Sequence, residues 1–250
     1  APAPTIALDV IAGDDILNAA EAGANVTISG TVVGEFNAGD VVTVTVNGTD
    51  YTDNVTAGGT FSVSVPGAQL QADADTTVDV SISTTDAAGN LGGDTGNRAY
   101  TVDVTAPAPT IAVSSIAVDD ILNAVEAAGN VDVVGTVVGE FNNGDTVTVT
   151  VNSNTYTGTV DGAGNFTISV LGADVQADPT VDVSISTTDA AGNLGGDSTS
   201  ATVTVDVTAP APTIALDVIA GDDILNAAEA GANVTISGTV VGEFNAGDVV

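Results

Sequence analysis

The chain carries one short acidic motif three times, and its residue types are those that bind hard metal ions. The motif reads GDDILNAAE at 13–21, VDDILNAVE at 118–126 and GDDILNAAE at 221–229. Each copy offers two aspartates, one asparagine and one glutamate. Calcium takes roughly six to eight such oxygen ligands in proteins and tolerates irregular geometry. The motif therefore points to calcium, provided that further oxygen ligands lie close to it in the fold.

The charge balance favours the same ion. Among 250 residues there are 33 acidic residues and one basic residue, Arg98, which gives a formal net charge of -32. Salt bridges cannot neutralise this charge, so counter-charges must come from solution. His and Cys are absent, which leaves softer metals without their usual ligands, and Mg²⁺ demands a tighter octahedron than Ca²⁺. Nucleic acid and anionic membranes would be repelled, so we expect neither as a partner.

The motif returns because the chain is built of repeats. Residues 1–42 and 209–250 are identical, and a diverged copy beginning near Ala106 lies between them. Self-similarity of this kind indicates a tandem array. We predict immunoglobulin-like repeats at 1–105 and 106–208, followed at 209–250 by the N-terminal part of a third repeat. We expect this part to be a window on a longer array, with a segment swapped into another copy as the alternative.

Each repeat alternates apolar and polar residues with a period of two. Val26, Ile28 and Val32 alternate with threonine and serine, and similar runs recur up to Val104. Such runs are typical of half-buried antiparallel strands, and Asn47-Gly48 between two of them signals a tight hairpin. Short strands with turns at this spacing predict an all-β chain of tandem immunoglobulin-like antiparallel β-sandwiches. The short TAPAPT linkers are stiff, so we expect the sandwiches to lie end to end as a rod.

The strand order predicts which loops meet between repeats. The acidic motif follows the first strand and should lie at the C-terminal end of its repeat. Loops 34–40 and 85–90 should lie at the N-terminal end. The candidate metal ligands at the first junction are Asp14, Asp15, Asn18, Glu21 and Asp103, with Asp73 or Asp75, facing Glu140, Asp145, Asp189 and Asn193. Their counterparts further along the chain are Asp119, Asp120, Asn123, Glu126, Asp206, Asp222, Asp223 and Glu229.

A purely local interpretation of the same residues stays open. Asp14 or Asp15 could cap a short helical turn at ILNAAEA, since a side-chain oxygen there accepts a free backbone amide. The sequence DAAGN could form a turn closed by its own aspartate. Both interpretations can hold together, because a capped turn can still present carboxylates to a metal ion.

The stretches DDILNAAEAG, VTVTVNGTDYT, ISTTDAAGN and YTVDVTAPAPTI carry a family resemblance. The whole chain resembles the bacterial immunoglobulin-like extender repeats of giant RTX adhesins, a group that includes biofilm-associated and ice-adhesion surface proteins. The pairing of DAAGN with VDVTAP is specific to this class. The resemblance implies calcium-rigidified extracellular rods that hold a distal adhesive domain away from the bacterial surface. It maps the family's metal ligands onto Asp14, Asp15, Glu21, Asp86, Asp103 and their counterparts.

Three functions compete for this sequence. Repetition favours a structural extender of an extracellular adhesin, whose partners are calcium and the neighbouring repeats of the same chain. The alternative is a self-assembling matrix or surface filament in which identical chains form the fibre themselves, and imaging of single strands against bundles would separate the two. An enzyme is not expected. The chain has no His, Lys or Cys, aromatic residues make up 3% of it, and no acid pair is unique to one site.

Overall fold

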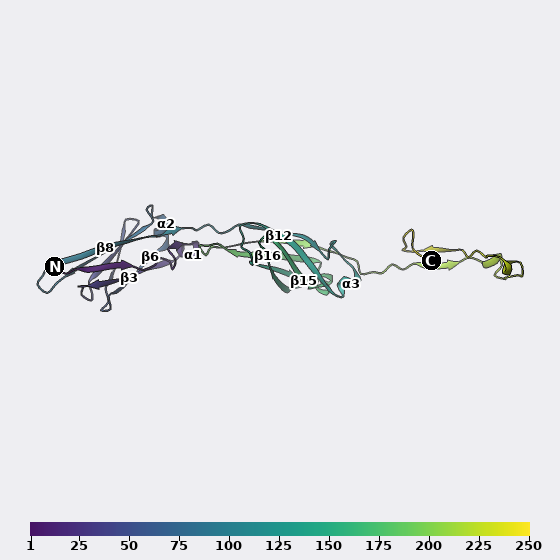
Figure 1. Ribbon diagram of the computed structural model, residues 1–250, viewed down its shortest axis with the longest axis horizontal. Helices are drawn as coiled ribbons and strands as arrows, with labels where there is room; N and C mark the ends of the chain where they lie inside the picture. The colour runs from purple at the N-terminus through teal and green to yellow at the C-terminus, as the bar shows by residue number, and fades with distance from the viewer.

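The computed structural model describes residues 1–250, and repeat 1 (1–105), repeat 2 (106–208) and the third segment (209–250) follow one another along its longest axis (Figure 1). Repeat 1 pairs two antiparallel sheets. The first contains β1 (Pro4–Leu8), β3 (Asn25–Gly34) and β6 (Thr60–Pro66) in the order β1-β3-β6. The second contains β5 (Thr49–Asn54), β4 (Val41–Val46), β7 (Thr77–Thr85) and β8 (Leu91–Ala99) in the order β5-β4-β7-β8.

Repeat 2 has the same architecture. Its first sheet has the order β10-β12-β15, with β10 (Pro109–Ile116), β12 (Asn130–Gly139) and β15 (Asn165–Leu171). Its second has the order β14-β13-β16-β17, with β14 (Asn154–Thr159), β13 (Thr146–Val151), β16 (Thr180–Thr188) and β17 (Leu194–Thr202). The prediction of an all-β chain of antiparallel sheets is confirmed. The hairpin at Asn47-Gly48 is also present, because Val46 and Thr49 are register partners.

A short parallel bridge that the sequence pattern did not reveal carries the acidic motif in each of the two complete repeats. In repeat 1, β2 (Ile16–Leu17) pairs in parallel with β9 (Thr101–Val102). In repeat 2, β11 (Ile121–Leu122) pairs in the same way with β18 (Thr204–Val205). The bridge ties the motif to the last strand before the linker. It therefore places the motif beside the exit of each repeat.

Four short helices complete the two repeats. The first of each pair begins within the last three residues of the acidic motif, and the second follows β6 or β15. They are α1 (Ala19–Ala22), α2 (Gly67–Ala72), α3 (Ala124–Ala127) and α4 (Gly172–Ala177). No helix of the structure has the length and apolar character needed to cross a membrane.

Each repeat has its own hydrophobic core. Repeat 1 buries a cluster of 19 residues and repeat 2 a cluster of 20, and neither cluster includes a residue of the other repeat. Phe61 and Phe166 are 2% exposed and belong to the two cores. Phe61 lies over Gly30, where a Cβ atom would come 2.5 Å from its Cζ atom. Because the cores are separate, each repeat can fold as a unit. The two repeats are then joined by polar contacts.

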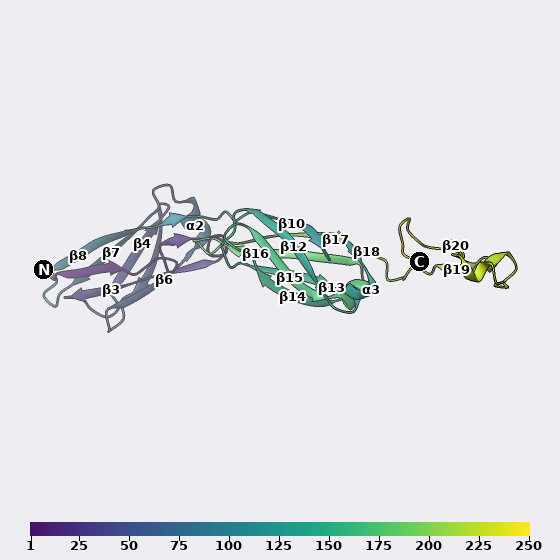
Figure 2. The same cartoon turned by 45° about the vertical axis from the view of Figure 1, so that its right-hand side comes forward.

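The third segment has the sequence of residues 1–42 but little of their structure. It forms β19 (Thr213–Leu216), β20 (Gly238–Val241) and the 3₁₀ turns η1 (Ile219–Gly221) and η2 (Glu229–Gly231). Ile6 is 5% exposed, whereas its copy Ile214 is 54% exposed. In Figure 2 β19 and β20 stand apart from both sandwiches. The second sheet is what lets this sequence bury its apolar face.

Candidate functional site

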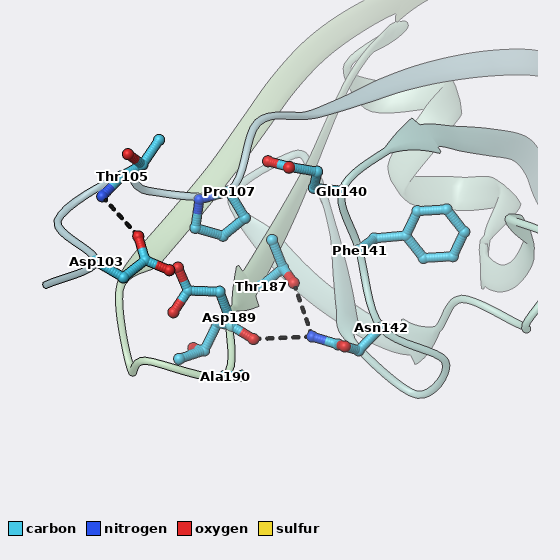
Figure 3. Close-up of a pocket in the computed structure, with 10 residues that line it drawn as sticks. Asp103, Thr105, Pro107, Glu140, Phe141, Asn142, Thr187, Asp189 and Ala190 are labelled. Atoms are coloured by element: carbon cyan, nitrogen blue, oxygen red, sulfur yellow. Dashed lines mark hydrogen bonds between the residues drawn. The ribbon is translucent and has the colours of Figure 1, made fainter. Parts of the chain in front are cut away.

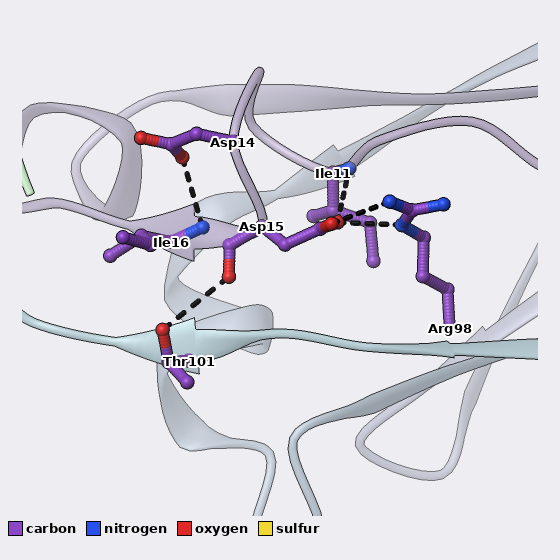
Figure 4. Close-up of polar contacts among 6 residues, drawn as sticks. All are labelled: Ile11, Asp14, Asp15, Ile16, Arg98 and Thr101. Carbon is purple, nitrogen blue, oxygen red and sulfur yellow. Dashed lines mark hydrogen bonds and ion pairs between the residues drawn. The ribbon is translucent and has the colours of Figure 1, made fainter.

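The acidic motif of repeat 1 is folded by its own carboxylates (Figure 4). Asp14 Oδ1 accepts a hydrogen bond of 2.9 Å from the amide of Ile16, and Asp15 Oδ1 accepts one of 2.9 Å from the amide of Ile11. Asp15 lies in the left-handed region with φ of 64°, a conformation that aspartate tolerates better than most residues. Both aspartates therefore shape the loop, as the local interpretation expects.

The chain's single basic residue also binds this motif. Arg98 Nε lies 2.6 Å from Asp15 Oδ1, and Nη2 lies 2.5 Å from Asp15 Oδ2. The Arg98 guanidinium, aided by the Ile11 amide, lowers the pKa of Asp15 to about 2. The carbonyl oxygen of Asp15 accepts from the amide of Thr101, which begins the parallel bridge. Asp15 thus joins the motif to the exit strand and already has a cation at its carboxylate.

Asn18 and Glu21 form a reciprocal capping box at the start of α1. Asn18 Oδ1 accepts from the amide of Glu21, and Glu21 Oε2 accepts from the amide of Asn18, both at 3.0 Å. The expected cap at Asp14 or Asp15 is therefore wrong, and Asn18 holds that position because a capping box needs Glu or Gln three positions later, which Asn18 has in Glu21. Asn123 and Glu126 form the same box in repeat 2.

Asn193 connects the two repeats directly. Its Oδ1 atom accepts a hydrogen bond of 2.8 Å from the amide of Ala19 in α1. Its Nδ2 atom donates to the carbonyl oxygen of Asp103 at 2.8 Å and to Asp189 Oδ2 at 2.9 Å. The side chain is buried, with a residue exposure of 4%. The loop before β17 therefore docks on the acidic end of repeat 1.

A pocket of about 310 Å³ opens beside this contact (Figure 3). Carboxylates of Asp103, Glu140 and Asp189 line it, and every charged group in its wall is acidic. Asp103 Oδ1 accepts from the amide of Thr105 at 3.1 Å, and Glu140 Oε2 accepts from the amide of Ala108 at 3.2 Å. The pocket thus gathers acidic groups from the end of repeat 1 and from two loops of repeat 2.

Asp189 is held in place in this pocket and kept charged. Hydrogen bonds from the side chain and amide of Asn193, and from the amides of Ala191 and Gly192, hold the pKa of Asp189 below its usual range. Asn142 ties the two loops together, because its Nδ2 atom donates to Thr187 Oγ1 at 3.3 Å and to the carbonyl of Thr188 at 2.8 Å.

The same pocket exists at the N-terminal end of repeat 1. It has a volume of about 460 Å³ and is lined by Glu35, Asn37 and Asp86, the counterparts of Glu140, Asn142 and Asp189. Hydrogen bonds from Asn90 again lower the pKa of Asp86. The part of the pocket that repeat 2 contributes thus recurs in repeat 1.

The remaining candidates serve their own loops. Asp145 Oδ2 accepts from the Asn142 amide, Asp73 lies buried beside the Tyr100 hydroxyl, and Asp206 Oδ1 accepts from the Thr208 amide. Asp119, Asp120, Asp222, Asp223 and Glu229 each accept a nearby backbone amide, as their counterparts in repeat 1 do. The structure groups no three acidic side chains closely enough to hold a metal ion by themselves.

Three residues of the site were not among the sequence candidates. Arg98, Asn142 and Thr187 shape it, and only the asparagine gave a usable signal. Asn142 recurs at the same place as Asn37 within the GEFN stretch of each repeat. Arg98 contacts a residue 83 positions away, a separation over which the alternation of strands gives no register.

Known structures resemble this chain over nearly its whole length. One is a Ca²⁺-stabilized adhesin that helps an Antarctic bacterium reach out and bind ice, with 44% identity over 95% of this chain and 58% of that chain and a TM-score of 0.87. A second concerns host cell surface retention of a 1.5-MDa bacterial ice-binding adhesin, with 38% identity over 98% of this chain and 78% of that chain and a TM-score of 0.69.

A third comparison is with a single domain. A bacterial immunoglobulin-like domain from the M. primoryensis ice-binding adhesin is 43% identical, and the match covers 41% of this chain and all of that domain with a TM-score of 0.40. No protein-family model and no curated protein matches the chain. This chain spans 58% of the first of the three structures, so it corresponds to part of that protein.

Proposed function

This chain belongs to the family of immunoglobulin-like repeats of bacterial ice-binding adhesins, and from that premise we propose that it is a structural extender of an extracellular adhesin. The family membership confirms the resemblance and the immunoglobulin-like fold class that the sequence indicated. The proposal rests above all on one observation, the direct contact between Asn193 of repeat 2 and Ala19 of repeat 1. An extender keeps its length only if such joints hold successive repeats in a fixed arrangement.

The geometry suits an element whose task is distance. Each repeat has a closed core and presents its polar loops at the two ends, so the array grows along one axis (Figures 1 and 2). The linker from Thr105 to Pro107 is short, and proline restricts its backbone. Repeats 1–105 and 106–208 would act as successive rigid units, and 209–250 would begin the next one. The chain would lie outside the bacterial cell, and its role would be mechanical and not enzymatic.

Calcium would rigidify the joint. The side-chain ligands that the pocket at the first junction offers are oxygen atoms of carboxylates, of hydroxyl groups and of the Asn142 amide, and Arg98 is engaged by Asp15 outside this pocket. Such an all-oxygen, acidic donor set fits Ca²⁺. Since the acidic side chains are not grouped tightly enough to hold an ion alone, backbone carbonyls and water would complete the coordination. When bound, calcium would supply the positive charge that offsets the carboxylates of two repeats.

The residues of the chain divide this task. Asp103 belongs to the end of repeat 1, whereas Glu140 and Asp189 belong to repeat 2, so a shared cation would couple both sides of the joint. Asn193 keeps Asp189 ionised and oriented. Glu140 accepts from the amide of Ala108 and so holds the linker against the loop. Without a cation, repulsion among these carboxylates would favour an open joint.

A filament made only of identical chains is the alternative. It requires lateral contacts between copies, and a net charge of -32 on each chain opposes such contacts. The partners expected for the extender are therefore calcium and the adjacent repeats.

Calorimetric calcium titration of the full chain tests this proposal. Asp103→Asn should weaken the tightest binding by about tenfold, because ligand charge sets the affinity of such sites. Asp206→Asn is the matched control. It changes the equivalent residue at the end of repeat 2, but the segment that follows contains Glu243 and no counterpart of Asp189. Equal effects of the two variants, or no effect of Asp103→Asn, would contradict a calcium site at the first junction.

A further inference from the structure

The loop Asp189–Asn193 of repeat 2 and the loop Asp86–Asn90 of repeat 1 have one sequence but different surroundings. Both read DAAGN. In repeat 2 Asn193 is 4% exposed and Ala191 is 5% exposed, because the loop lies against the end of repeat 1. In repeat 1 the corresponding residues are exposed. The chain thus contains the same loop in a docked and an undocked setting.

The loop has its shape before it docks. Asp189 Oδ1 accepts from the amides of Ala191 and Asn193 at 2.9 and 2.8 Å. In the undocked loop, Asp86 Oδ1 accepts the two corresponding bonds at the same lengths, 2.9 and 2.8 Å. The following glycines have φ of 87° and 86°. Since the loop is already ordered, docking costs little conformational entropy.

The partner surface matches the chemistry of an asparagine side chain. It offers one donor, the amide of Ala19, and one acceptor, the carbonyl of Asp103. The first amide of a helix has no partner within the helix, so Ala19 needs an acceptor from elsewhere. An asparagine amide group accepts and donates at once and can satisfy both groups. Aspartate has the same shape but cannot donate to Asp103, and it would place a second carboxylate beside Asp189.

From this geometry we infer a function for the loop that calcium does not supply: Asn193 is a latch that sets the angle between successive repeats in the absence of metal. The partner surface is the end of the preceding repeat, formed by the Ala19 amide and the Asp103 carbonyl. Calcium acts on the carboxylates beside the latch, whereas the latch bonds are neutral amide contacts. Two net hydrogen bonds of this type should favour the docked joint by roughly 5- to 150-fold.

The two copies of the loop supply their own control. Asn193→Ala removes the two bonds to repeat 1 and also the bond to Asp189 Oδ2 at 2.9 Å. Asn90→Ala removes the equivalent bond within its loop, to Asp86 Oδ2 at 2.8 Å, and no bond between repeats. The difference between the variants therefore isolates the latch. Asn193→Asp, with Asn90→Asp as its control, removes the donor while keeping the shape.

Pulsed electron paramagnetic resonance on the full chain measures the joint. The chain has no native cysteine, so spin labels at Ser62→Cys and Thr167→Cys report one distance between the exposed strand faces of the two repeats. With chelator present, Asn193→Ala and Asn193→Asp should broaden this distance distribution, and the Asn90 variants should leave it unchanged. Far-ultraviolet circular dichroism should show that all variants remain folded.

The outcomes separate the latch from the calcium proposal. Equal distributions for the Asn193 and Asn90 variants in chelator would overturn the latch, whether or not calcium narrows them. Broadening by the Asn193 variants alone supports the latch even if calcium has no effect on the wild type. In that second case the calcium proposal fails and the latch stands.

Discussion

The ion pair between Asp15 and Arg98 should make the exit of repeat 1 more stable than that of repeat 2. Arg98 is a register partner of Val78, and the equivalent partner of Val181 in repeat 2 is Ala201, so Asp120 has no guanidinium beside it. The pair has two short contacts, and its side chains are 33% and 29% exposed. Paired but partly exposed charges of this kind contribute about 1 kcal/mol.

Asp15→Asn removes the ion pair, and Asp120→Asn is its control. Asparagine retains an acceptor for the amide that each aspartate binds, Ile11 or Ile116, and it also tolerates positive φ. A loss of about 1 kcal/mol should lower the melting temperature of repeat 1 by about 4–8 °C. Asp120→Asn should change that of repeat 2 much less. Nuclear magnetic resonance signals from residues 43–105 report the melting of repeat 1, and signals from residues 112–203 report that of repeat 2. Residues 1–42 are not used, because residues 209–250 have the same sequence.

The stabilisation of repeat 1 by the Asp15–Arg98 ion pair should depend on pH. The pKa of Asp15 is about 2 in the folded chain, against an ordinary value of 3.8. Its contribution should be present above pH 3.8, decline as the pH falls toward 2 and be absent below that. Wild type and Asp15→Asn should therefore converge at low pH and in high salt. A constant difference across pH, or equal losses for Asp15→Asn and Asp120→Asn, would refute the ion-pair account.

Two further predictions concern the core of repeat 1. Gly30→Ala would place a Cβ atom 2.2 Å from the Ala7 carbonyl oxygen and should cost about 1–3 kcal/mol in denaturant unfolding, whereas Gly58→Ala, which meets nothing closer than 3.8 Å, should be close to neutral. Burial, followed by the nearby Asp73, raises the pKa of Tyr100 above its ordinary value of 10.0. Repeat 1 should therefore lose stability as the pH rises above 10, and Tyr100→Phe should reduce that loss in thermal melts read by circular dichroism.

The alternation of residues was sufficient to predict the sandwich but not all of its strands. Runs such as Val26 to Val32 bury every second side chain, so their period is visible in the sequence. The alternation does not predict strand β8, because its residues alternate only between half-buried and exposed. Strand β8 needs glycine where a neighbouring backbone leaves no room for a side chain. A Cβ atom at Gly92, for example, would lie 2.0 Å from the Pro2 carbonyl oxygen. Such a requirement is invisible before the strands are placed.

The candidate site, like the fold, is predictable from the sequence only in part. Counting strands indicates which loops face each other, and the structure brings Asp103, Glu140 and Asp189 to one pocket. The contact of Asn193 with Ala19 spans 174 positions and depends on the angle between two repeats, which no local pattern encodes. Hydrogen-bond geometry also decided the capping residue in favour of Asn18. Local chemistry is therefore predictable from sequence to the extent that its partners are local.

Small-angle X-ray scattering of the full chain, with calcium and with chelator, tests the central claim most directly. Chelation should leave the circular dichroism of the sandwiches unchanged, because their cores are separate from the joint. It should also shorten the maximum dimension and broaden the distance distribution, since the acidic joint loses the cation that offsets its carboxylates. A maximum dimension that stays the same in both conditions would contradict a calcium-rigidified extender.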